Sequence, residues 1–129
     1  MSSYVGRFAP SPTGPLHFGS LIAALASYLD AKHHDGLWLL RIEDLDPPRE
    51  LTSAPKQIMS QLRACGLHWD QEVLFQHSRL DAYQGYLDKL STVTYPCICP
   101  RNPGVYAGTC RMRTYPQTKK PYAIRLKTH

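Results

Sequence analysis

The chain has 129 residues, of which 43% are apolar, and it carries 15 basic and 10 acidic residues for a formal charge of +5. This length predicts about one domain, and the apolar fraction is large enough for a buried core, which excludes a disordered chain. The positive charge is concentrated towards the C-terminus, because all eight charged residues after Asp88 are basic. A basic region of this kind favours a polyanionic partner.

The sequence carries the pattern of neither a membrane-spanning nor a secreted protein. Its longest uncharged stretch, residues 8–29, is broken by prolines and glycines, and no apolar run follows a basic start as in a signal peptide. We therefore expect a cytoplasmic protein with no membrane partner. In a reducing compartment, three cysteines within 14 residues favour a metal site over disulfides; they are Cys97, Cys99 and Cys110.

The first predicted elements are a strand, a loop, a helix and a second strand. Residues 3–8 have strand character, and three prolines and a glycine within residues 9–15 predict a loop. Helix formers dominate residues 16–33, and residues 37–42 are a short apolar run typical of a buried parallel strand. The apolar face expected on the helix comprises Leu21, Leu25 and Leu29. This order predicts an α/β fold built on a right-handed crossover unit.

Two more helices are predicted, followed by a region rich in loops. The first covers residues 54–65, and its last residue, Cys65, is expected to be a small buried hydrophobe. The second covers residues 78–90, with Ser78 as the cap. Beyond it, prolines and glycines recur, and only residues 122–127 have strand character.

An anion site is predicted where the first loop meets the first helix. The first turn of a helix exposes unpaired N–H groups and the positive end of its dipole, and Gly14 and Gly19 permit close approach. His17 can donate a hydrogen bond to a phosphoryl oxygen. An acidic cluster should lie at the end of the neighbouring strand, facing the same crevice; it comprises Glu43, Asp44 and Asp46. The alternative is that His17 only caps the helix and that the acidic cluster is a solvated loop.

Two sequence blocks resemble a known family. Residues 7–20, Arg-Phe-Ala-Pro-Ser-Pro-Thr-Gly-Pro-Leu-His-Phe-Gly-Ser, resemble the signature opening of the glutamyl-type class I aminoacyl-tRNA synthetases. Residues 41–46, Arg-Ile-Glu-Asp-Leu-Asp, resemble the second block of that family. Within the family, residues 44–50 are most similar to the subgroup that acts on the queuosine base of tRNA(Asp).

The resemblance spans essentially the whole chain and implies its fold and activity. The fold would be the N-terminal half of a Rossmann-like nucleotide-binding domain in residues 1–90, with a basic zinc-containing insertion in residues 91–129. The activity would be the ATP-dependent conversion of L-glutamate to glutamyl-adenylate, with Mg²⁺ accompanying ATP. Glutamate would then be transferred to queuosine in the anticodon of tRNA(Asp). In such chemistry the protein supplies positioning and charge stabilisation, with no covalent nucleophile.

The resemblance also implies which residues form the site. By this resemblance, His17 and Gly19 are the catalytic residues that contact ATP. The residues implied for glutamate are Arg7, Phe8, Ala9, Pro10, Ser11 and Glu43. The residues of the implied ATP-binding motif are Pro10, Ser11, Pro12, Thr13, Gly14, Pro15, Leu16, His17, Phe18, Gly19 and Ser20. In physical terms, an arginine can donate two parallel hydrogen bonds to the carboxylate of the substrate, and a glutamate can bind the ammonium group of the substrate.

The three clustered cysteines predict a structural zinc site. Cys97 and Cys99, two residues apart, can project to one metal from a tight turn, and Cys110 supplies a third soft ligand. The family resemblance implies Tyr106 as the fourth ligand. The alternatives are a three-sulfur site closed by water or a histidine, and a set of free thiols in a loop.

The family's Lys-rich loop and the second half of its sheet are missing, so we expect the N-terminal piece of a longer enzyme. One alternative is an ordinary glutamyl-tRNA synthetase that charges the tRNA 3′ end. Another is an inactive or RNA-binding fragment stabilised by zinc. Contact with RNA phosphates is the expected role of some basic residues around the cysteines, namely Arg101, Arg111, Arg113, Lys119 and Lys120.

Overall fold

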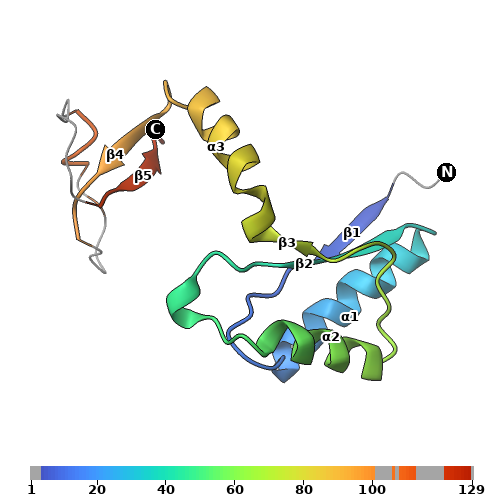
Figure 1. Ribbon diagram of the computed structural model, residues 1–129. Coiled ribbons are helices and arrows are strands. Elements are labelled where there is room, and N and C mark those ends of the chain that lie inside the picture. The colour runs from blue at the N-terminus through green and yellow to red at the C-terminus, as the bar shows by residue number, and fades with distance from the viewer. Residues whose placement is uncertain (1–3, 101–105, 107, 113–120, 129) are drawn as a thin grey trace. The chain divides into compact units, whose positions relative to one another are not determined.

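The computed structural model describes residues 4–100, 106, 108–112 and 121–128. The chain divides into two compact units, Met1–Leu80 and Asp81–His129. The first contains a parallel sheet with helices, and the second contains a small antiparallel pair of strands (Figure 1). The domain boundary proposed between residues 90 and 91 remains a prediction. Within the described residues, no helix has the length and apolar character needed to cross a membrane.

The first unit is built on a three-stranded parallel sheet. Strand β1 (Val5–Phe8), helix α1 (Phe18–His33) and strand β2 (Leu37–Ile42) form the predicted crossover unit. A short third strand, β3 (Leu74–Phe75), pairs with the end of β2 and gives the order β1-β2-β3. The sequence did not predict β3, because two residues are too few to carry a strand pattern.

The core of the first unit lies on one face of this sheet. Alternate residues of β2, namely Trp38, Leu40 and Ile42, are buried on that face. The core also contains Ala24 and Ala31 of α1, and Ile58 and Leu62 of helix α2 (Ala54–Ala64). Both helices therefore cover the same side of the sheet (Figure 1).

The face by which α1 packs differs from the predicted one. The buried side consists of alanines, and a Cβ added at Gly6 of β1 would lie only 3.0 Å from the Ala31 Cβ. Leu25 and Leu29 remain 46% and 56% exposed. Leu21, the third residue of the predicted face, is half-buried. The reason is that small residues let the helix axis approach the strand closely, so Leu25 and Leu29 are left on the outer side.

Two further predictions were wrong. Cys65 is exposed, because it is the C-cap of α2 and lies beyond the last turn that packs on the sheet. Ser78 does not cap a helix; its hydroxyl donates to the Phe75 carbonyl inside a 3₁₀ turn, Gln76–Arg79, and helix α3 (Leu80–Lys89) starts after that turn.

Asp70 fastens the segment before β3 to the start of β2. Its carboxylate accepts hydrogen bonds from the Trp38 N–H at 2.6 Å and from Lys32 Nζ at 2.7 Å. The Asp70 N–H in turn donates to the Trp38 carbonyl at 2.9 Å. The bonds from Lys32 and from the Trp38 backbone lower the pKa of Asp70. This anchor aligns the third strand with the other two.

The second unit has little apolar core. Strand β4 (Thr94–Cys97) pairs antiparallel with strand β5 (Ala123–Leu126), which confirms the predicted final strand. Strand β4 itself was not predicted because it contains Pro96, which a two-stranded sheet tolerates since both of its strands are edges. Among the described residues of this unit, only Cys97 and Cys110 are buried.

Candidate functional site

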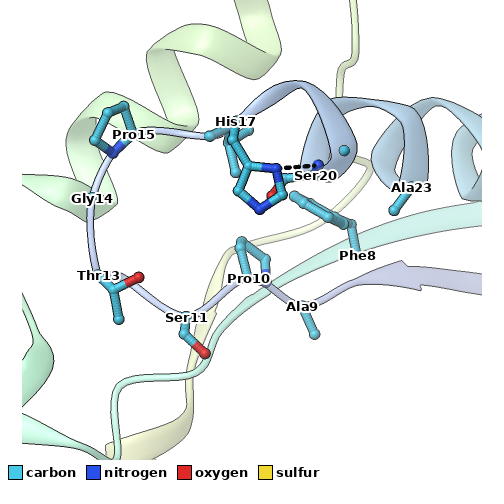
Figure 2. Close-up of a pocket in the computed structure, with 12 residues that line it drawn as sticks. Phe8, Ala9, Pro10, Ser11, Thr13, Gly14, Pro15, His17, Ser20 and Ala23 are labelled. Atoms are coloured by element: carbon cyan, nitrogen blue, oxygen red, sulfur yellow. Dashed lines mark hydrogen bonds between the residues drawn. The ribbon is translucent and has the colours of Figure 1, made fainter.

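A pocket forms where β1 leads through the proline-rich loop into α1 (Figure 2). It has a volume of about 440 Å³. The residues that line it are Phe8, Ala9, Pro10, Ser11, Thr13, Gly14, Pro15, Leu16, His17, Gly19, Ser20 and Ala23. Most of the predicted ATP motif is thus gathered around one cavity. Pro12, which is fully buried, and Phe18, which is 79% exposed, are not among its described lining residues.

The loop is held in place by neighbouring segments of the chain. Three hydrogen bonds anchor it: Glu43 N–H to the Pro10 carbonyl (3.0 Å), Leu51 N–H to the Pro12 carbonyl (2.9 Å), and Leu16 N–H to Gln61 Oε1 (2.8 Å). No local pattern indicated Gln61, a polar residue on α2 whose role depends on the folded position of the loop. These bonds make the pocket wall a preformed feature.

His17 is the N-cap of α1, and its ring also borders the pocket (Figure 2). Its Nδ1 accepts the Ser20 N–H at 3.2 Å, so a neutral ring carries its proton on Nε2. The capping role and the pocket role of His17 therefore coexist. The N–H groups of Phe18 and Gly19, in the first turn, have no acceptor within the helix and are available to an anion.

Gly19 makes room for the His17 ring. A Cβ at this position would lie 3.2 Å from both Cε1 and Nδ1 of that ring. Such contacts are closer than ordinary van der Waals distance, so any side chain at residue 19 would press on the imidazole.

The two charged residues predicted for glutamate do not line this pocket in the described part of the chain. Arg7 is exposed on β1, on the sheet face opposite the core. Glu43 follows β2, and its Oε1 accepts a hydrogen bond from Arg41 Nη2 at 2.5 Å. The Arg41 Nε is buried with no hydrogen-bond partner among the described atoms. Sequence reasoning missed this pair, although alternation along the strand places residues 41 and 43 on one face.

The acidic cluster is satisfied by basic neighbours. Asp44 accepts the His77 N–H at 3.0 Å and also contacts the His77 imidazole. Burial raises the pKa of Asp44, but these bonds outweigh it and leave the pKa below its ordinary value. Asp46 accepts a hydrogen bond from Arg49 Nε at 2.5 Å. Among the described residues, this cluster does not have metal-ligand spacing.

A second site lies in the second unit, where Cys97, Cys99 and Cys110 converge. Their sulfur atoms all lie within 4.8 Å of one another, and those of Cys99 and Cys110 are 3.4 Å apart. The Tyr106 hydroxyl lies 3.6 Å from Cys97 Sγ and accepts the Cys110 N–H at 2.8 Å. The four predicted ligands are therefore brought together, and this group could hold a metal.

The spacing of this group fits a tetrahedral ion. Zinc–sulfur bonds of about 2.3 Å place two sulfur ligands about 3.8 Å apart, close to the separations found here. Burial raises the pKa of Cys97, but interactions with Tyr106, the Cys99 backbone and Arg125 outweigh it and lower that pKa overall. The neighbouring Cys110 thiol raises the pKa of Cys99 to about 11, and burial raises that of Tyr106.

Most of the basic residues predicted to contact RNA lie outside the described residues. These are Arg101, Arg113, Lys119 and Lys120. Arg111 is described and exposed, and its N–H donates to the Gly108 carbonyl at 2.9 Å. Its side chain is accessible to a partner.

The chain has a parallel crossover unit with a pocket at the N-terminus of the connecting helix. This arrangement places it in the Rossmann-like class of α/β proteins. The model of the family described as tRNA synthetases class I (E and Q), catalytic domain, matches residues 4–103. The chain therefore belongs to this family of class I tRNA synthetases.

Individual relatives agree with this assignment. The chain is 52% identical to a glutamyl-Q tRNA(Asp) synthetase of Vibrio parahaemolyticus over 98% of its length, and 54% identical to one of Salmonella paratyphi A over 85%. It spans only 44% and 39% of those two proteins. Among solved structures, a glutamate tRNA ligase from Elizabethkingia meningosepticum matches with a TM-score of 0.70 and 36% identity, over 74% of this chain and 21% of that protein.

Proposed function

We propose that the protein activates L-glutamate with ATP and transfers it to the queuosine base in the anticodon of tRNA(Asp), in the cytoplasm. The observation that supports this most directly is the preformed pocket at the N-terminus of α1, which joins a helix dipole, two available N–H groups and His17. Because the chain spans less than half of its relatives, the activity proposed is that of the full-length gene product.

The proposed chemistry is an in-line displacement at phosphorus. A glutamate carboxylate oxygen attacks the α-phosphorus of ATP, the bond to the β-phosphate bridging oxygen breaks, and glutamyl-adenylate and pyrophosphate form. His17 would donate its Nε2 proton in a hydrogen bond to a phosphoryl oxygen, while the first-turn N–H groups stabilise the negative charge. Mg²⁺ would arrive with ATP.

The proposed amino-acid site combines Arg7 and Glu43 with the loop. Arg7, exposed on β1, would bind the glutamate carboxylate as a two-pronged donor. Glu43 has one carboxylate oxygen bonded to Arg41, and its second oxygen would receive the substrate ammonium group. The loop would supply hydrogen bonds from Ser11 and the backbone of Ala9.

The relatives support queuosine as the acceptor of the glutamyl group. Those that match over nearly the whole chain are named glutamyl-Q tRNA(Asp) synthetases, whereas the solved glutamate tRNA ligase is 36% identical over a smaller share of this chain.

We further propose that Cys97, Cys99, Tyr106 and Cys110 hold one structural zinc ion. Zinc in such a site would add stability that the small core of the second unit lacks.

The proposed function is tested by glutamate-dependent exchange between ATP and pyrophosphate. The full-length gene product is expected to catalyse this exchange without tRNA and then to label tRNA(Asp) that carries queuosine, but not tRNA(Asp) that lacks it. Labelled glutamate at the 3′ end of a tRNA would instead identify an ordinary glutamyl-tRNA synthetase. Absence of glutamate-dependent exchange both without and with tRNA would exclude both enzymes.

Replacing Glu43 by glutamine is expected to raise the glutamate concentration needed for exchange by about 100-fold, because the variant loses a charge-assisted bond to the ammonium group. Zinc content should not change, since Glu43 and the cysteines belong to different compact units. The matched control is Glu72→Gln, at an exposed acidic residue of the same unit. Equal glutamate dependence in both variants would remove Glu43 from the proposed site.

A further inference from the structure

The proposed zinc site carries excess negative charge in a buried place. Three thiolates and Zn²⁺ sum to −1, and a phenolate at Tyr106 would make the sum −2. Two of the ligands, Cys97 and Cys110, are only 2% and 1% exposed. A buried charge of this kind is costly unless a group of opposite sign lies beside it.

One cation of the second unit lies against this cluster. Arg125 belongs to β5, and its guanidinium carbon lies 4.1 Å from the centre of the Tyr106 ring. The Cys97 sulfur is close enough to this guanidinium to raise the pKa of Arg125. Arg125 thus lies against the Tyr106 ring and interacts with Cys97, from a strand that carries neither of these two proposed ligands.

Arg125 has no carboxylate as a competing partner in the described part of the chain. None of the described ion pairs includes it, and the sequence has no acidic residue after Asp88. Its Nε is buried and makes no hydrogen bond with any described atom. The guanidinium therefore lies beside the phenol and sulfur groups that would carry the negative charge of a zinc-bound cluster.

We propose that Arg125 is a positioning residue of the metal site, where it balances the charge of the bound cluster and holds the Tyr106 ring so that its oxygen faces the metal. The planar guanidinium can stack on the ring and donate to Cys97 at the same time, which a lysine cannot reproduce. Groups around metal ligands commonly orient them and raise metal affinity in this way. This inference rests on the proposed zinc site.

Zinc affinity provides the first test, measured on the 129-residue chain by competition with a chromophoric chelator. Arg125→Gln is expected to weaken zinc binding about 10-fold or more. Arg125→Lys, which keeps the charge without the stacked plane, should recover only part of that loss. The matched control is Lys127→Gln, because Lys127 follows the same strand but donates to the Thr92 carbonyl instead of the cluster. Zinc affinity should stay unchanged in the control.

A spectroscopic readout separates positioning from a general loss of stability. Zinc added to the unmodified chain should produce the ultraviolet difference signal of a tyrosinate, and Tyr106→Phe should abolish it. At saturating zinc, Arg125→Gln should show a weakened signal, whereas Lys127→Gln should show the full one. Equal affinity and equal signal in Arg125→Gln and the unmodified chain would overturn the role of Arg125 alone. Failure of the unmodified chain to bind zinc would overturn the metal site itself.

Discussion

Replacing Cys97 by serine is expected to reduce bound zinc from about one ion per chain to almost none, because a neutral hydroxyl is a poor substitute for a thiolate ligand. The second unit should then lose its resistance to proteolysis, since apart from Cys97 and Cys110 none of its described residues is buried. Metal analysis together with limited proteolysis measures both effects. The first unit has its own core and should remain folded.

The chain offers a matched control for this experiment in its fourth cysteine. Cys65 is exposed at the end of α2, in the other compact unit, so Cys65→Ser should keep the full zinc content and the full protease resistance. A normal zinc content in Cys97→Ser would reject that residue as a ligand. Loss of zinc in both variants would point to damage unrelated to coordination.

Replacing Gly19 by alanine is expected to reduce the rate of glutamate-dependent ATP–pyrophosphate exchange on the order of 10 to 100-fold, because the displaced His17 ring would no longer be aligned with the phosphate. The added methyl group would lie 3.2 Å from two atoms of that ring. Alanine is the better helix former, so helix content should not fall. The measurement is made on the full-length gene product, with circular dichroism as the check on folding.

The control for this substitution is Gly85→Ala, also within a helix. A Cβ at Gly85 in α3 meets nothing within 4 Å, so exchange should be unchanged and stability should rise by about 1 kcal/mol. If Gly19→Ala retained full exchange activity while Gly85→Ala behaved as expected, contact between residue 19 and the His17 ring would have no bearing on activation.

The elements that local signals describe well were predicted closely. Prolines and a glycine marked the loop before α1, and the apolar run at 37–42 matches β2 at both ends. The helix predicted from residue 16 begins at Phe18, because His17 serves as its cap. Such features depend on residues close together in sequence, and therefore a single sequence is enough to identify them.

The features that were missed depend on contacts between distant residues. Strand β3 exists because Asp70 aligns its segment with β2, 32 residues away in the chain. The packing face of α1 depends on Gly6, which admits Ala31 at close range, so the helical pattern of leucines indicated the wrong side. For the candidate site, the structure brings the predicted loop residues around one pocket and the predicted cysteines into one cluster. The supporting contacts of Gln61, Arg41 and Arg125 became apparent only in the folded chain.

The outer side of α1 presents an apolar surface that we expect to affect the solubility of this chain. Its exposed apolar residues, Phe18, Ile22, Leu25 and Leu29, lie in one unit with β1, which is paired on one side only among the described strands. Apolar surface and an unpaired strand edge both promote association with other copies of a chain. The basic residues after Asp88 act in the opposite sense, because like charges repel. The apolar surface of the first unit therefore favours aggregation, and the positive charge of the second unit opposes it. Added salt screens the charge repulsion and so promotes aggregation.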